Sequence, residues 1–224
     1  MARNIQDIAP LLADHFIDVE IDAAILKENN RLIADNEKRL GLFHKYLGQL
    51  HDSWIIKTEV TAHLFSIVLN DFSTHVFSDV IVEKKKLNID HDKLVFPICL
   101  DFEIISLTFN TVDESGNIQA IEPITINEYL YEQVISVDNN KIEIGLIVWK
   151  DGKAPQQGEH ILILMSVKNI TLTELQANAW SEIFENAYED YYNYFRQQRN
   201  KGRYVSDQSN SRELYEEFEK QRQG

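Results

Sequence analysis

An α+β fold is predicted for this chain, with N-terminal helices and a long C-terminal helix packed on a mainly antiparallel, multi-stranded sheet. Two changes of pattern predict it. Apolar residues recur at helical spacing through the first 50 residues, and from Trp54 the period falls to about two, in short segments rich in β-branched and aromatic residues. These strand-like segments follow one another with no helical pattern between them, which indicates antiparallel pairing and not βαβ units.

The first 50 residues are expected to be helical, in two patterns. In "NIQDIAPLLADHFI", apolar residues recur every three to four positions, and Pro10 falls early enough to sit in a first turn. A longer apolar pattern begins after Asp22. Gly41 and Gly48 interrupt this second pattern, and glycine is expected to break or end a helix at such positions.

The β-rich segment is predicted to span residues 54–168. Its clearest hairpin is "YEQVISVDNNKIEIGLIVW", residues 131–149, in which two strand-like runs flank a turn signal. Pro97 lies inside a strand-like run, which favours an edge or a bulge because proline cannot donate a hydrogen bond to a sheet. Turn residues separate several of the runs, at positions 113–117, 138–140 and 150–159.

Residues 1–199 are predicted to form a single α+β domain that ends in a long helix over residues 171–199. Thr171 and Glu174 have the spacing of a capping box at the start of that helix. Residues 200–224 are expected to form a polar linker and a short helix. Because so short a helix is marginal alone in water, its apolar side chains must be covered by the chain itself, by a second copy or by a partner protein. We expect the chain itself to cover them.

The composition is that of a soluble globular protein, with 44% hydrophobic and 26% charged residues in a chain of 224. Cys99 is the only cysteine, which excludes an internal disulfide and suits a reducing compartment. No apolar run is long enough for a membrane helix, and the N-terminus lacks the apolar region of a signal peptide. The expected location is the cytoplasm, without membrane attachment.

The formal net charge of −14 limits the choice of partner. Residues 101–170 contain eleven acidic residues against four lysines and no arginine, so this part of the chain would repel phosphate backbones. The one basic run, "EKKK" at 83–86, is more typical of edge-strand protection than of a nucleic-acid site. A basic protein is therefore the expected partner and nucleic acid is not, while the oligomeric state stays open.

His51, Asp52 and Ser53 are adjacent where the helical part meets the β-rich part, in "GQLHDSWIIKTEV". Hydrolases use these three residue types together, but neighbours in a strand point to opposite faces, and catalytic triads are assembled from distant positions. The triplet is interpreted as a helix-to-strand connection in which Asp52 or Ser53 bonds to nearby backbone. No catalytic residue is predicted.

The same junction carries a resemblance to known domains. A helix ending in "LHDS", then a meander of strands, then "NEYLYEQVISVDNNKIEIGLIVW" is similar to small uncharacterised bacterial domains in which a Leu/Phe-His-Asp segment leads into a sheet. The similarity covers roughly residues 47–170. Some of these domains occur in toxin–immunity gene neighbourhoods, so the resemblance implies this kind of fold and a role in protein binding. It implies no catalytic residue.

Other chemical candidates have the wrong spacing. "NIDHDK" at 88–93 begins like a calcium loop, yet Lys93 and Cys99 stand where a glycine and a bidentate glutamate are required. The histidines never fall at a metal-binding spacing, and Gly145 does not belong to a phosphate-binding loop. Cys99 lies in an apolar run and is interpreted as a small buried side chain. No metal or cofactor is predicted.

Candidate partner-binding residues lie on the two predicted C-terminal helices. Tyrosine is favoured at protein interfaces, and the predicted long helix carries tyrosines with acidic neighbours at the margin of its apolar arc. The last helix offers one short apolar stripe. The candidate residues are Tyr188, Tyr192, Tyr194, Glu185, Glu189, Leu214 and Phe218.

The sequence favours a non-enzymatic, acidic protein-binding module, most concretely an immunity-type inhibitor of a basic toxin or effector. Two alternatives stay open. One is a hydrolase whose site is assembled from scattered Asp, Glu and His residues, since active sites are defined by geometry. The other is a structural subunit of a larger assembly, docked through its C-terminal helix.

Overall fold

A computed structural model describes residues 3–48, 50–70, 97–150, 158–175, 194 and 211–223. Contacts divide the chain into two compact units, one made of residues 1–70 and 98–174, the other of residues 71–97 and 175–224. The domain boundary predicted near residue 199 lies outside the described residues. The first unit contains the N-terminal helices and nearly the whole of the described sheet.

The predicted helical N-terminus is confirmed, as a series of short helices. They are α1 (Ile5–Ile8), the 3-10 helix η1 (Pro10–His15), α2 (Ala23–Asp35), α3 (Glu37–Leu40) and α4 (Phe43–Tyr46). Pro10 begins η1, where its missing N–H leaves no hydrogen bond unmade. The Asp22 carboxylate caps α2 by accepting a hydrogen bond from Ala24 N at 2.7 Å. Gly41 ends α3 with a φ of 59°, a left-handed conformation that suits glycine.

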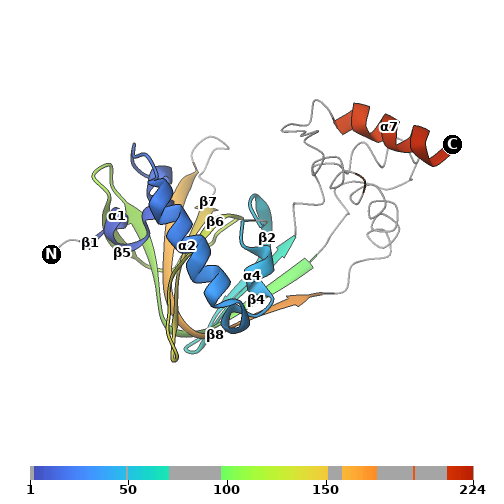
Figure 1. The fold of residues 1–224 in the computed structure, drawn as a ribbon. Helices are drawn as coiled ribbons and strands as arrows, with labels where there is room; N and C mark the ends of the chain where they lie inside the picture. Colours follow the sequence, from blue (N-terminus) through green and yellow to red (C-terminus); the bar gives the residue numbers. More distant parts are fainter. Residues whose placement is uncertain are drawn as a thin grey trace. The chain divides into compact units, whose positions relative to one another are not determined.

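The described residues contain eight strands in one antiparallel sheet, which confirms the predicted sheet. The strands are β1 (Arg3–Asn4), β2 (Ser53–Val60), β3 (Leu64–Asn70), β4 (Pro97–Val112), β5 (Asn117–Ile121), β6 (Glu128–Val137), β7 (Ile142–Lys150) and β8 (Glu159–Glu174). Their order is β1-β5-β4-β3-β2-β6-β7-β8, and β4 also pairs with β8. Strands β4, β3, β2, β6, β7 and β8 therefore close into a ring, and Figure 1 shows how strongly they curve.

The predicted hairpin at residues 131–149 is confirmed as β6 and β7, with Val134 opposite Ile144. Its turn is held by Asp138, whose Oδ1 accepts hydrogen bonds from Asn140 N at 2.7 Å and Lys141 N at 2.9 Å. The turn predicted at 113–117 joins β4 to β5. Pro97 is the first residue of β4, and bulges interrupt the pairing of that strand with β8 between Glu103 and Ser106.

The capping box predicted at Thr171 and Glu174 is wrong, because β8 continues through both residues. Thr171 pairs with Asp101 and Glu174 with Ile98 on the long neighbouring strand β4. The β-branched residues of "NITLTE" suit a paired strand. Pairing with β4 stabilises this segment as a strand more than the local capping signal stabilises it as a helix. The rest of the predicted long helix lies outside the described residues, apart from Leu175 and Tyr194.

Two hydrophobic clusters lie on opposite faces of the sheet. On the inner face, Leu146 of β7 packs with Leu40 of α3 and Phe43 of α4 in the cluster that fills the ring. On the outer face, Ile147 of β7 packs with Leu12 of η1 in a smaller cluster. Successive residues of a strand point to opposite sides, so Leu146 and Ile147 belong to different clusters.

Gly145 allows η1 to lie directly against β7. A Cβ at this position would come within 3.0 Å of Leu12 Cδ1 and 3.6 Å of Ala9 Cβ. The missing side chain therefore serves the close approach of a helix to a strand.

The second unit contains α7 (Ser211–Gln223), which confirms the short C-terminal helix. Phe218 is 8% exposed, and the centroid of its ring lies 5.4 Å from that of Tyr194. The apolar side chain of Phe218 is thus packed against a residue of the same chain.

None of the helices in the described part of the chain has the length and apolar character needed to cross a membrane.

Candidate functional site on the outer face of strand β6

Strand β6 presents Tyr131, Gln133 and Ile135 on its outer face. Tyr131 lies opposite Ile147 and Gln133 opposite Gly145, the two β7 positions that η1 covers. The backbone N–H of Leu11 in η1 donates to Gln133 Oε1 at 3.0 Å. This bond ties η1 to the strand. Two sites flank this attachment, a histidine cluster around Tyr131 and an acidic groove around Gln133.

The histidine cluster consists of three histidines, two aromatic residues and two carboxylates: His15, His51, His160, Tyr131, Trp149, Asp14 and Asp52. His15 stacks on Tyr131 with ring centroids 3.9 Å apart, and the ring of His51 lies 4.4 Å from that of Tyr131. The rings of Trp149 and His160 meet edge to face at 5.1 Å. These residues come from η1, the segment before β2, and strands β6, β7 and β8, so only the fold brings them together.

Within this cluster, His51 and Asp52 converge, contrary to the expectation that sequence neighbours point apart. The two residues lie in a turn before β2, and Asp52 has a φ of 61°, a left-handed conformation that aspartate tolerates better than most residues. The turn brings Asp52 Oδ2 within 2.7 Å of His51 Nδ1, while His51 Nε2 bonds to the Tyr131 hydroxyl. Sequence analysis missed this Asp52–His51–Tyr131 chain.

Ser53, the third residue of the triplet, belongs to the inner side of the sheet. It is fully buried, it lies opposite Tyr129 of β6, and its backbone N–H donates to Leu50 O at 3.1 Å. His51 and Asp52 therefore meet Tyr131 on the outer face while Ser53 points inward. The triplet is not a serine-hydrolase site.

His15 and Tyr131, whose rings stack at the centre of the cluster, are both held in their neutral forms. Burial lowers the pKa of His15, and the neighbouring His160 and His51 lower it further, against the opposing effect of Asp14. Burial also raises the pKa of the Tyr131 hydroxyl, and the charges of Asp52 and Asp14 add to this shift. Near pH 7, Tyr131 is a hydrogen-bond donor and not an activated nucleophile.

Within the described residues, no group of three or more His, Cys, Asp or Glu side chains is placed to hold a metal ion.

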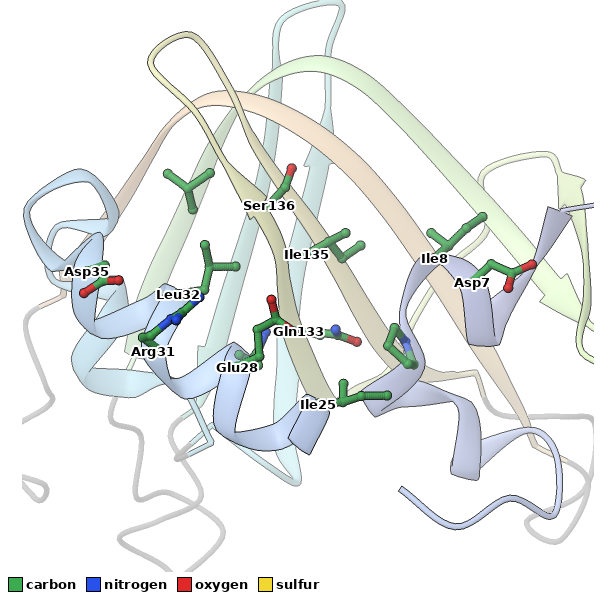
Figure 2. Close-up of a pocket in the computed structure, with 13 residues that line it drawn as sticks. Asp7, Ile8, Ile25, Glu28, Arg31, Leu32, Asp35, Gln133, Ile135 and Ser136 are labelled. Carbon is green, nitrogen blue, oxygen red and sulfur yellow. The ribbon is translucent and has the colours of Figure 1, made fainter. Parts of the chain in front are cut away.

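The acidic groove is an open depression of about 450 Å³ between α1, η1, α2 and β6 (Figure 2). Asp7, Glu28 and Asp35 supply three carboxylates, and Arg31 supplies one cation. The apolar lining comes mainly from Ile8, Ile25, Leu32 and Ile135. A ligand suited to this groove combines positive charge with apolar surface.

Helix α2 presents its charges to the groove along one side. Glu28, Arg31 and Asp35 are three and four residues apart, so they share a face of the helix. Among the described residues, Arg31 makes no ion pair with either neighbour, which leaves both carboxylates available to a ligand. Asn29 holds the helix in place, because its Nδ2 donates to Val134 O on β6 at 2.6 Å.

Gln133 is the most buried polar residue in the lining of the groove, with 5% of its surface exposed. Its Oε1 is occupied by the backbone N–H of Leu11. Because a backbone N–H can bond only to an acceptor, the amide atom that faces Leu11 is the oxygen. The nitrogen Nε2 therefore lies on the other side of the amide. In the part of the chain that the structure describes, Nε2 has no hydrogen-bond partner.

The inner face of β6 carries a second unusual polar group, Glu132. It accepts a hydrogen bond from the backbone N–H of Gly48, and it lies opposite Leu146 of the inner cluster. Burial raises its pKa to about 7, although Gly48 and the Tyr129 hydroxyl both favour the charged form. Tyr129 lies nearby, yet its buried hydroxyl makes no well-aligned hydrogen bond to any described residue. Part of the Glu132 side chain still reaches the surface.

Of the residues that sequence analysis proposed for partner binding, the described ones belong to neither the histidine cluster nor the acidic groove. Tyr194 and Phe218 pack together in the second unit, and Leu214 lies within α7. Four of the candidates, Tyr188, Tyr192, Glu185 and Glu189, lie outside the described residues, as do "EKKK" and "NIDHDK". Neither half of the outer-face site was among the predicted residues, since helical periodicity points to packing and carries no information on which helix meets which strand.

Cys99 is only partly buried, which corrects its interpretation as a core residue. Its Sγ lies 3.5 Å from Ser66 Oγ and donates to Asp101 Oδ1 at 3.5 Å. Burial raises the pKa of the thiol, so Cys99 is not a reactive thiolate near neutral pH.

Comparisons with protein-family models, with curated proteins and with solved structures find no match to this chain. The acidic groove and the histidine cluster are therefore the features of the chain that bear on its function.

Proposed function

We propose that this chain is a non-enzymatic, acidic protein-binding module that docks a basic segment of a partner protein in the acidic groove. The observation that supports the proposal most directly is the lining of the groove, where three carboxylates and one arginine surround apolar side chains. The net charge of −14 adds long-range attraction for a basic partner. An immunity-type inhibitor of a basic toxin or effector is the most concrete form of this function, in line with the resemblance of residues 47–170.

The groove suits the side chains of lysine and arginine because these combine an apolar stem with a charged end. The stem can lie on Ile25 and Leu32 while the charge reaches Glu28 or Asp35. Carboxylates on the exposed rim contribute more to the rate of association and to specificity than to affinity. Binding is therefore expected to weaken steeply as salt is added.

A defined peptide tests the proposal. A labelled peptide of alternating arginine and valine should bind the full chain, and a glutamate–valine peptide should not. We expect Glu28→Gln and Asp35→Asn each to weaken binding by roughly two- to fivefold, the effect of losing one exposed charge pair. Fluorescence anisotropy at two salt concentrations measures both the affinity and its electrostatic part.

Glu114→Gln is the matched control for these variants. Glu114 is exposed in the turn between β4 and β5, so its substitution changes the net charge by the same amount without touching the groove. Equal weakening by Glu114→Gln would mean that only the net charge attracts the peptide. No binding of the basic peptide at low salt would contradict the proposal.

A hydrolase with a site assembled from distant residues is the second candidate, and one observation favours it. The Asp52–His51–Tyr131 chain orients a histidine by a carboxylate, as a general base is oriented. If this function holds, a panel of activated ester and phosphate substrates should be hydrolysed, and His51→Gln should abolish the activity. Equal hydrolysis rates in the wild type and in His51→Gln would exclude a hydrolase site at this histidine.

A further inference from the structure

We infer that the occupant of the acidic groove is an extended peptide segment that makes two contacts at once: a backbone carbonyl accepts a hydrogen bond from Gln133 Nε2, and a neighbouring arginine or lysine side chain reaches Glu28 or Asp35. This inference rests on the proposed function and specifies the chemistry that the same groove recognises. It adds a hydrogen-bond requirement to the charge requirement.

The hydrogen-bond requirement comes from Gln133. Its side chain is almost completely buried, one end of its amide holds η1 through Leu11 N, and the other end has no described partner. Figure 2 shows this side chain in the groove beside α2. A buried donor left without a partner is unfavourable, so a ligand that displaces water from the groove must offer an acceptor there.

The charge requirement comes from α2. Glu28 and Asp35 face the groove from one side of the helix, and neither forms an ion pair with Arg31. A ligand therefore needs a cation for the helix and an acceptor for the strand. A polyamine has the cation without the acceptor, and a phosphate or carboxylate has the acceptor without the cation. A peptide with basic side chains has both.

The position of Gln133 on β6 also suits a peptide backbone. The residue lies at the base of the groove and is fixed by the Leu11 bond, so its free N–H points in a defined direction. A fixed donor recognises the main chain of any extended segment, while the carboxylates select the side chains. This division of roles is common in peptide recognition, where main-chain hydrogen bonds supply affinity and side-chain contacts supply specificity.

Two probes separate the two requirements. One is the arginine–valine peptide, which has cations and carbonyls; the other is spermine, which has cations alone. The informative variant is Gln133→Glu, in which one oxygen still accepts from Leu11 N while the amide donor is lost. We expect peptide affinity to fall roughly five- to tenfold at pH about 8, because an acceptor then faces the peptide carbonyl. Spermine affinity should stay level or rise, since the variant adds negative charge.

Acidification supplies an internal control. Protonation of the introduced carboxyl restores a donor at the same place, so the peptide affinity of the variant should recover as pH falls while that of the wild type changes less. Arg31→Gln is the companion variant, and it should strengthen the binding of both probes by roughly two- to fivefold because it removes the cation found among the described lining residues. Thermal unfolding of each variant confirms that the fold is retained.

The outcomes distinguish this inference from the function on which it rests. Weaker peptide binding with level or stronger spermine binding in Gln133→Glu supports the inference. Unchanged or stronger peptide binding in that variant overturns it, while the proposed function still stands because basic peptide binds. If neither probe binds the wild type, the proposed function fails and the inference fails with it.

Discussion

Strand β6 places polar side chains on both of its faces, and the surroundings of these side chains differ between the two faces. On the inner face, Tyr129 is fully buried and Glu132 mostly so, and burial raises the pKa of Glu132 to about 7. On the outer face, Tyr131 and Gln133 have polar partners and border a cluster or groove open to solvent. The comparison shows that alternate residues of one strand can have unrelated roles. The inner groups are expected to affect stability, and of the outer ones Gln133 lines the groove in which we propose that a ligand binds.

The largest expected effect comes from Glu132→Gln, which tests the inner face. The pKa of Glu132 is about 7 in the folded chain against 4.5 as its ordinary value, so the folded state binds the proton more tightly. Stability therefore falls as pH rises from about 4.5 to about 7. Glutamine can still accept the bond from Gly48, and the variant should be more stable by up to about 3 kcal/mol at pH about 8. Urea unfolding across this pH range measures the effect.

The control for this prediction is the low-pH end of the same curve. Below pH about 4 both forms carry a neutral side chain at this position, and their unfolding free energies should agree closely. A constant difference across all pH values would show that Glu132 acts through packing and not through its charge. Because part of the Glu132 side chain reaches the surface, about 3 kcal/mol is the upper limit of the stabilisation expected for Glu132→Gln.

A smaller effect, about 1–3 kcal/mol, is expected for Gly145→Ala on the outer face. The added Cβ would come within 3.0 Å of Leu12 Cδ1, so the buried Leu12 side chain must shift by a few tenths of an ångström against the rest of η1. That movement strains the Leu11–Gln133 bond, so peptide binding in the groove should weaken together with stability. Thermal unfolding and the anisotropy assay measure the two consequences. In a Leu12→Ala background the penalty of Gly145→Ala should shrink, and an equal penalty in both backgrounds would assign it to another contact.

The smallest expected effect concerns the protonation of His15 in the histidine cluster. Burial, His160 and His51 lower its pKa below 6.5, so its folded form resists protonation. Stability is then lost as pH falls through 6.5, the opposite direction from Glu132. The effect is best measured in the Glu132→Gln background, where the opposing contribution is removed. NMR titration should place the His15 midpoint below 6.5, and His15→Gln should reduce the loss on acidification; a midpoint above 6.5 would contradict the packing described.

Local sequence was sufficient for the elements whose contacts are local. The hairpin of β6 and β7 follows from two alternating runs around Asp138, whose carboxylate bonds to backbone N–H groups two and three residues away. Gly41 ends a helix by its own conformation, and Asp22 caps one from two residues away. The charge that supports a basic partner was also readable, because it is a sum over the chain.

Tertiary structure alone decided the two halves of the outer-face site and the end of β8. Gln133 and Leu11 are 122 positions apart, and His51 meets Tyr131 only because β2 pairs with β6. Thr171 lies in a strand because β4 is long enough to pair with it. The periodicity of a sequence tells which side chains share a face, but the neighbours of that face depend on strand order and helix placement. Those are set by the packing energy of the whole chain.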